Sequence, residues 1–362
     1  MARRIGIGIL AAIGVVLATC AVRQAAIAAD VKMSPALTKL VKAAQAEGEL
    51  NVLWGSALGG AEGVRALQTA INRTYGINVK VKYTPGPSMP QMASRTIQEV
   101  KAGRTASSDI FIGVEVTIPA MVKADVLVQV PWSDYFPNIT PKMTAVGGRA
   151  LQIVTLFNGV LYNAQMIPAD KVPKTMADIF RPEWKGKIAS TPYAVGFDRI
   201  ALVDGFDKIK PIVQKTAEWA GGLIRCGENE RIATGEFLML FLDCGRVEEN
   251  FLVKNGGPLG HATLDDALAT SLWYFAIPKT SAHPNLSILF SGFVDSQEGQ
   301  AIIDKYGHDT SHLISGTPAY EHAQSLEKRG LHLLALGPDE LMPREEELGK
   351  YKNAFQTILR KK

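Results

Sequence analysis

The sequence lacks the residue patterns that identify several large classes of protein. It contains neither the Walker pattern nor GxGxxG, so no nucleotide cofactor is expected. The six histidines form no HExxH or other paired motif and the three cysteines do not supply a zinc site, so no resident metal is expected either. No serine lies in a GxSxG elbow. A secreted hydrolase with Ser56 or Cys244 as nucleophile is therefore only the alternative to a protein without catalytic residues.

Long apolar runs are also scarce outside the N-terminus. There, Arg3-Arg4 precedes an uncharged run from Ile5 to Val22, and Ala26-Ile27-Ala28 forms an A-x-A cleavage site. We predict a signal peptide over residues 1–28. The alternatives are an uncleaved membrane anchor and a lipid attached at Cys20, where the preceding threonine is unusual.

The predicted mature chain has no large excess of charge of either sign. Removal of residues 1–28 takes away three arginines, so 36 basic residues face 35 acidic ones and the net charge falls from +4 to +1. An extended nucleic-acid or membrane-binding surface is therefore not expected.

The predicted mature chain retains Cys226 and Cys244 in a compartment that permits oxidation. A bridge between them would close a loop of 18 residues and contribute roughly 3 kcal/mol. Two separate buried thiols are the alternative.

What is present is an alternation of strand and helix patterns in a chain long enough for about two domains. A helix is predicted from Ser34-Pro35 to Gly48, because serine and proline suit its first positions and glycine its end. Strand and helix patterns then alternate from Leu50 to Ile112, which favours a mainly parallel sheet flanked by helices. Such sheets bind ligands at the carboxyl ends of their strands. The loops expected at that edge are Gly55–Gly60, Thr84–Met89 and Gly113–Thr117.

The middle of the chain predicts a crossing into a second lobe and a return from it. Val130–Gly148 is rich in proline and glycine, and the apolar, β-rich stretch that follows it is expected to leave the first lobe. Phe180–Asp198 reads as a turn, a short strand and a helix start, and Ser271–Ile277 as the returning strand. We predict a first lobe over 29–150 plus 278–362 and a second lobe over 151–277.

Four side chains at these loops are candidate ligand contacts. Ser56 lies in a glycine-rich turn between a strand and a helix, where the alternative is a merely permissive turn. Ser88 is the expected N-cap of a helix, and its hydroxyl alternatively bonds only to that helix. Thr191 opens a predicted helix, and Arg199 follows within it. Arg199 can hold a carboxylate or phosphonate with two hydrogen bonds, or be an ordinary surface arginine.

Three motifs resemble bacterial extracellular solute-binding proteins of ABC importers, in particular the group that includes the periplasmic ferric-ion-binding proteins. They are GVLYN from Gly159, DIFRPEWKGK from Asp178, and HPNLSILFSGFVDSQEGQ from His283, which is similar to the family signature HPNAAKLFIDFLLSPEGQ. The resemblance spans roughly Glu47 to Tyr306.

The resemblance implies roles for further residues. Glu115 falls near the first-lobe carboxylate that coordinates iron in the ferric-binding relatives, with a solvated loop glutamate as the alternative. Thr191, Tyr193 and Arg199 fall on a second-lobe loop that holds an anion in those relatives. Asp243-Cys244, however, stands where the relatives carry adjacent tyrosines as iron ligands, so the usual iron site is not carried over.

These observations together predict an α/β protein of the periplasmic-binding-protein type II, with two helix-flanked sheets and two crossings. Its expected role is to capture a small organic or phosphorus-containing anion in the periplasm and deliver it, as a monomer, to an ABC permease in the inner membrane. Ferric-iron binding with non-standard ligands is the alternative within the family. A sensor module of the same fold is another alternative.

Overall fold

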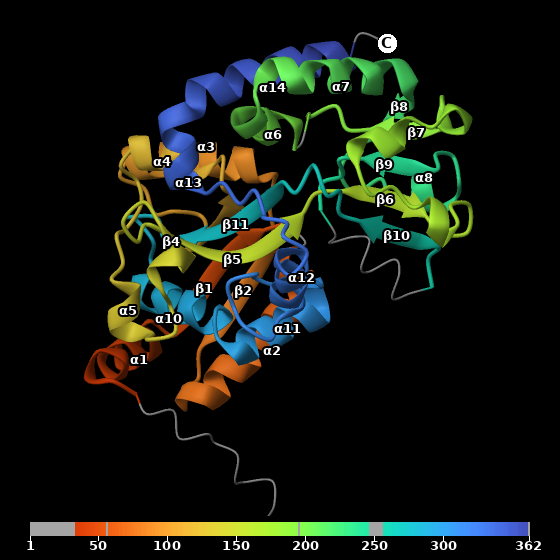
Figure 1. Ribbon diagram of the computed structural model, residues 1–362. Helices are drawn as coiled ribbons and strands as arrows, with labels where there is room; N and C mark the ends of the chain where they lie inside the picture. Colours follow the sequence, from red (N-terminus) through yellow and green to blue (C-terminus); the bar gives the residue numbers. More distant parts are fainter. Residues whose placement is uncertain (1–32, 56, 195, 246–255, 361–362) are drawn as a thin grey trace, which may run out of the picture.

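The computed structural model describes residues 33–55, 57–194, 196–245 and 256–360 (Figure 1). The predicted signal peptide and Ser56 lie outside these residues. The described chain is a mixed α/β structure whose strands form sheets with the orders β1-β2, β3-β11-β5-β4 and β10-β6-β9-β7-β8. Within the described ranges, no helix has the length and apolar character needed to cross a bilayer.

The N-terminal part of the chain builds the first two sheets. Its elements are α1 Pro35–Glu47, β1 Glu49–Trp54, α2 Gly60–Tyr75, β2 Lys80–Pro85, α3 Met89–Lys101, β3 Phe111–Val114, α4 Ile118–Lys123, α5 Trp132–Tyr135, β4 Thr144–Ala145 and β5 Ala150–Phe157. The predicted first helix is confirmed: the Ser34 hydroxyl accepts a hydrogen bond from the N–H of Leu37, and Gly48 ends the helix with φ of 73°.

The middle of the chain builds the five-stranded sheet. Its elements are β6 Val160–Asn163, β7 Ile188–Ser190, α6 Phe197–Asp204, α7 Phe206–Trp219, β8 Ala220–Leu223, α8 Glu230–Ala233, β9 Met239–Phe241 and β10 Leu259–Ala262. Strand β7 is parallel to both β8 and β9, whereas β6 is antiparallel to β9 and β10.

The remaining elements return to the first sheets and then leave them again. They are β11 Thr270–Ala276, α10 Pro284–Val294, α11 Gln297–Gly307, α12 Pro318–Glu327, α13 Pro338–Leu341 and α14 Glu345–Leu359. Strand β11 lies between β3 and β5 and is antiparallel to both. The expectation of a mainly parallel first sheet therefore holds for β1 and β2 alone, because the returning strand comes from a distant part of the chain that local patterns do not reveal.

Two buried clusters organise the molecule. The first core surrounds Trp54 and Phe275, whose rings stack with centroids 5.3 Å apart. The second core surrounds Phe197, Phe241 and Phe355, and each of these side chains is almost completely buried.

Helix α14 belongs to the second core, which differs from the prediction that the whole of 278–362 joins the first lobe. It packs against α6 and α7, with Phe355 stacked on Phe206 at 5.1 Å (Figure 1). Strands β5 and β11, predicted from the sequence as the leaving and returning crossing segments, both pair within the sheet that contains β3. An amphipathic pattern tells that a helix is half-buried but not which core it covers, so the sequence could not assign α14.

Candidate functional site

The strands β1 and β2 end side by side, which brings two of the predicted loops together. Trp54 pairs with Pro85 at the last position of the parallel ladder, and the N–H of Gly86 donates to the carbonyl of Trp54. The Tyr83 hydroxyl donates to the carbonyl of Gly55 at 2.6 Å. The loops after these strands therefore share the edge at which open α/β sheets bind ligands.

The same arrangement recurs in the five-stranded sheet. Ser190 and Phe241 are the last paired residues of the parallel strands β7 and β9, and the Ser190 hydroxyl donates to the carbonyl of Phe241 at 3.3 Å. Beyond β9, Gly245 lies so close to β5 that an added Cβ would come within 2.6 Å of the Cβ of Leu156. The carboxyl ends of β7 and β9 therefore face the four-stranded sheet.

Strained backbone marks these strand ends. Leu58, Ala194 and Leu242 follow β1, β7 and β9, with φ of 57°, 57° and 46°. A left-handed conformation costs a non-glycine residue roughly 1–2 kcal/mol and persists only where the surroundings impose it. Half of the six non-glycine residues with positive φ in the described chain occupy these three loops.

Glu115 and Arg199, predicted separately as ligand contacts, instead contact each other across the two halves of the molecule. Arg199 Nε donates to Glu115 Oε1 at 2.8 Å, and Arg199 Nη2 donates to the same oxygen. Glu115 Oε2 accepts the N–H of Leu272 on β11 at 2.9 Å, and Asp198 Oδ1 accepts Arg199 Nη1 at 3.2 Å. The side chains of Glu115 and Arg199 are 0% and 7% exposed, so neither the solvated loop glutamate nor the surface arginine describes them.

The electrostatics of this cluster keep Arg199 charged. Burial opposes the charge, but the carboxylates of Glu115 and Asp198 outweigh it and raise the pKa of Arg199. Two carboxylates against one guanidinium leave the cluster with an excess of negative charge. In this conformation three of the five N–H donors of Arg199 are bonded to carboxylates.

The other predicted residues have different surroundings. Ser88 is exposed and its hydroxyl donates to Gln91 Oε1 at 3.0 Å, so it serves its own helix. Thr191 is buried directly after β7, and the backbone carbonyl of half-buried Tyr193 accepts a hydrogen bond from Gln356 of α14. Helix α6 then begins after Gly196, which provides no side-chain cap, and in its first turn the Asp198 carboxylate accepts the N–H of Arg199 at 2.9 Å.

A buried polar cluster beside the end of β9 was not predicted. Asp243 Oδ1 accepts the N–H of Gly159 at 2.8 Å and lies 3.4 Å from His261 Nε2, and the amide of Asn158 donates to the Asp243 carbonyl. These residues fix the short connection from β5 to β6. Asp243 was noted only for what it replaces in the family, because its partners lie far away in the sequence.

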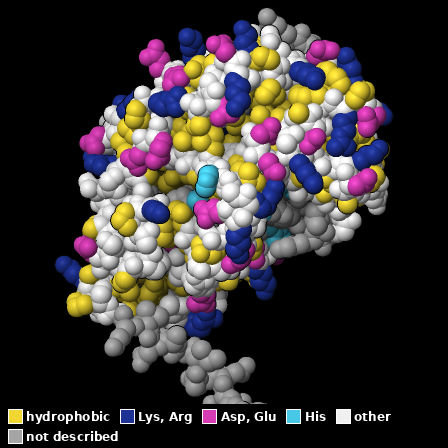
Figure 2. All heavy atoms as spheres, in the orientation of Figure 1, with side chains coloured by type: hydrophobic (Ala, Val, Ile, Leu, Met, Phe, Trp, Pro, Cys, Tyr) yellow, Lys and Arg dark blue, Asp and Glu magenta, His cyan; other side chains and the backbone are white. Residues whose placement is uncertain are grey.

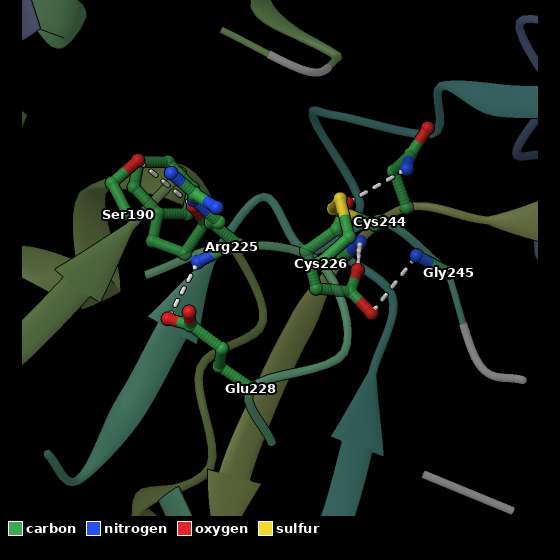
Figure 3. The surroundings of a disulfide bond; sticks show 10 residues. Ser190, Arg225, Cys226, Glu228, Cys244 and Gly245 are labelled. Carbon is green, nitrogen blue, oxygen red and sulfur yellow. Dashed lines mark hydrogen bonds between the residues drawn. A yellow bond between two sulfur atoms is a disulfide. The ribbon is translucent and has the colours of Figure 1, made fainter. Parts of the chain in front are cut away.

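A disulfide joins Cys226 to Cys244, which resolves the alternative left open by the sequence (Figure 3). Their Cα atoms are 5.7 Å apart. The bridge ties the loop after β8 to the residue that follows Asp243, and so anchors one of the strained strand ends. A disulfide-bonded Cys244 cannot act as a nucleophile.

Comparisons with known proteins agree with this architecture. Residues 66–327 match the family model described as bacterial extracellular solute-binding protein. No curated protein sequence gives a significant match.

Solved structures match over most of their length. Iron-bound HitA from Pseudomonas aeruginosa is 18% identical with a TM-score of 0.67, and the match covers 85% of this chain and 99% of HitA. A substrate-binding protein of an ABC transporter from Agrobacterium tumefaciens is 16% identical with a TM-score of 0.70, covering 86% of this chain and 94% of that one. AfuA from Actinobacillus pleuropneumoniae, with bound fructose-6-phosphate, is 16% identical with a TM-score of 0.65, covering 87% and 99%. At these identities the similarity establishes the fold, a periplasmic-binding-protein type II architecture. With its family model matched over residues 66–327 of 362, the chain belongs to the bacterial extracellular solute-binding protein family.

Proposed function

We propose that the protein is the periplasmic solute-binding component of an ABC importer and that its solute is a small organic or phosphorus-containing anion. Family membership supports the binding role, and the structural neighbour from A. tumefaciens is a component of an ABC transporter. The neighbour AfuA holds fructose-6-phosphate, and a further neighbour, IdiA from Trichodesmium, holds iron and citrate. Fructose-6-phosphate and citrate are both organic anions of the proposed class.

The observation that carries the proposal is the strained backbone at the strand ends. Leu58, Ala194 and Leu242 place three left-handed residues in the loops where β1, β7 and β9 end. Backbone strain of this kind concentrates at ligand clamps, because only a functional demand or a strong local constraint maintains it. The solute would lie between these loops, with Thr191 and Tyr193 nearest to it.

Backbone N–H groups rather than Arg199 would hold the anion. Arg199 is already bonded to Glu115 and Asp198, whereas the start of α6 after Gly196 offers backbone donors and a favourable helix dipole, of which the Asp198 carboxylate in the first turn occupies only the N–H of Arg199. The ion pair between Glu115 and Arg199 would instead join the two halves around the bound solute. A closed form of this kind would then dock on the membrane permease, after export into the periplasm.

The alternatives have less support. The described residues contain no group of three His, Cys, Asp or Glu side chains arranged to hold a metal ion, and Cys244, which stands where the ferric-binding relatives carry a tyrosine ligand, is bonded to Cys226. A hydrolase would need a nucleophile, and Cys244 is bonded to Cys226.

Ligand-induced thermal stabilisation of the mature protein tests the proposal. Phosphate, fructose-6-phosphate, a phosphonate and citrate are compared with ferric iron, a neutral sugar and a polyamine. Binding to the folded state alone stabilises it by about 2.7 kcal/mol when the ligand is at a hundred times its dissociation constant, so we expect the midpoint to rise with at least one anion.

Two valine substitutions locate the site. Thr191→Val removes a buried hydroxyl after β7 and is expected to reduce the shift caused by the anion. Thr216→Val removes an equally buried hydroxyl from α7, where it bonds to the carbonyl of Ile212, and is expected to leave the shift unchanged. A shift with iron alone, or one that Thr191→Val does not alter, would contradict the proposed ligand or its place.

A further inference from the structure

A cavity lies apart from the strand ends, on a face of the four-stranded sheet. It measures about 340 Å³ and is lined by β4, β5 and β11 on one side and by residues 335–340, which precede and begin α13, on the other. This volume is within the range of small-molecule sites. None of the loops after β1, β2, β7 or β9 contributes to its lining.

His312 presents a fixed hydrogen-bond donor to this cavity. The Thr155 hydroxyl oxygen accepts hydrogen bonds from Gln152 Nε2 at 3.0 Å and from the backbone N–H of His312 at 3.2 Å. Both lone pairs are thus occupied, so the hydroxyl proton must point to His312 Nδ1 at 2.6 Å. Because Nδ1 is an acceptor, the neutral ring carries its proton on Nε2. Burial lowers the pKa of His312 to about 4, so the ring stays neutral at pH 7.

Tyr274 adds a second donor. Its side chain lines the cavity, and among the described residues its hydroxyl has no hydrogen-bond partner. Burial raises the pKa of Tyr274, and the carboxylates of Glu115, Glu340 and Asp339 raise it further. The hydroxyl therefore keeps its proton and can donate it to a ligand.

The rim of the cavity is acidic. Asp339 and Glu340 are exposed, and each uses one carboxylate oxygen for a backbone N–H, that of Val146 at 3.0 Å and that of Gly337 at 2.9 Å. Their other oxygens are left for a cation. Lys142 contributes one positive charge to the same rim. Acidic and basic side chains are interspersed over the face drawn in Figure 2, where histidine atoms lie beside acidic ones near the middle.

We propose that this cavity binds a small amino-acid-like zwitterion. Its carboxylate would accept hydrogen bonds from the Tyr274 hydroxyl and His312 Nε2, and its ammonium group would lie beside the free oxygens of Asp339 and Glu340. Neutral donors below and carboxylates at the rim match a molecule that carries both groups better than a plain anion or a plain amine. The site is separate from the strand ends proposed for the transported anion.

Calorimetric titration of the mature protein at pH 7 tests the site. The probes are L-serine, glycerate, which lacks the ammonium group, and ethanolamine, which lacks the carboxylate. We expect L-serine to bind at least about tenfold more tightly than either, since each missing group loses a charge-assisted contact. Equal binding of all three, or no binding of L-serine, would overturn the proposal.

Matched variants place the binding. Tyr274→Phe keeps the ring and removes the hydrogen-bond donor. Asp339→Asn keeps an oxygen that accepts the N–H of Val146 and removes the negative charge. Each variant is expected to weaken L-serine binding by about tenfold. Tyr351→Phe removes a hydroxyl that donates a hydrogen bond to Glu347 on α14, and it should leave L-serine binding unchanged. L-serine binding unaffected by both Tyr274→Phe and Asp339→Asn would refute the site. Asp339 is exposed, so its variant reports even if Tyr274→Phe folds poorly.

The proposals for the two sites can be tested independently of each other. Thr191→Val, which is expected to weaken binding of the transported anion, should leave L-serine binding unchanged. Tyr274→Phe should leave the anion-induced thermal shift unchanged.

Discussion

The ion pair between Glu115 and Arg199 is the residue-scale contact on which the relation of the two halves depends. Removing one partner of a buried pair leaves the other charge uncompensated, which lowers the free energy of unfolding by about 3–5 kcal/mol. We therefore predict that Arg199→Gln lowers the free energy of unfolding by about 3–5 kcal/mol, measured by urea denaturation.

An exposed ion pair provides the control. Glu49 and Lys82 pair on the surface of β1 and β2, and Glu49→Gln should lower the free energy of unfolding far less than Arg199→Gln does. If the two variants lose similar stability, the buried pair does not contribute as its geometry suggests.

Asp295 gives a second residue-scale prediction, with a defined pH dependence. Both of its carboxyl oxygens lack a hydrogen-bond partner among the described residues, and burial raises its pKa well above the usual value. The folded state therefore holds a proton that the unfolded state releases above its own pKa of about 3.9. The associated stability is fully present below that pH and is lost as the pH rises towards the folded-state pKa.

Asp295→Asn removes the ionisable group and nearly keeps its shape. We expect the variant to be more stable than the wild type at pH 7, and the difference to shrink as the pH falls towards 4. Thermal unfolding across this range measures it, with the exposed Asp170→Asn as the control. A constant difference at all pH values would show that Asp295 is not held protonated.

At the same scale, the sequence identified side chains but not their partners. Glu115 and Arg199 were both singled out, yet they are 84 positions apart and nothing local indicates that they meet. Asp243 and His261 are nearer in sequence, but Asp243 follows β9 and His261 lies on β10, in a sheet whose order only the fold determines.

At the scale of elements, the disulfide holds the end of β9 to the loop after β8. Replacing both Cys226 and Cys244 by serine is expected to lower the free energy of unfolding by about 3 kcal/mol, because the unfolded chain regains the freedom of an 18-residue loop. Denaturation in urea measures the loss. Dithiothreitol should reproduce it in the wild type and change nothing in the variant, and a reductant that acts equally on both would contradict this account.

Elements with strong local signals could be predicted, and elements placed by distant contacts could not. The serine cap and terminal glycine of α1, and Gly76 after α2 with φ of 63°, are encoded within a few residues. The insertion of β11 between β3 and β5 depends on residues more than a hundred positions away. The left-handed positions themselves, Ala194 and Leu242, are not glycines, so the sequence did not mark them as turns of this conformation.

At the scale of the whole molecule, the C-terminal segment joins the two cores. Val116 beside β3, Leu202 of α6, Leu341 of α13 and Leu348 of α14 form one small apolar cluster. Lys123 of α4 adds an ion pair to α14. The two halves are thus held together by packing beyond the chain connections near Asn158 and before β11.

Phe355 tests the dependence of the second core on the end of the chain. It is fully buried against Phe197 and Phe206, so Phe355→Ala should cost about 3–5 kcal/mol. Lys352→Ala changes an exposed position of the same helix and should cost little. Near-ultraviolet circular dichroism during urea unfolding separates the two, and equal midpoints would mean that α14 is dispensable to this core.

The position of α14 also sets the order in which the protein can fold. The second core contains Phe197 and Phe241 from the middle of the chain together with Phe355 and Leu359 from its last turn of helix. Domains usually fold from the N-terminus as synthesis proceeds. Here, the second core cannot close until α14 has been synthesised. Until α14 emerges, the apolar side chains from the middle of the nascent chain therefore remain without their final packing.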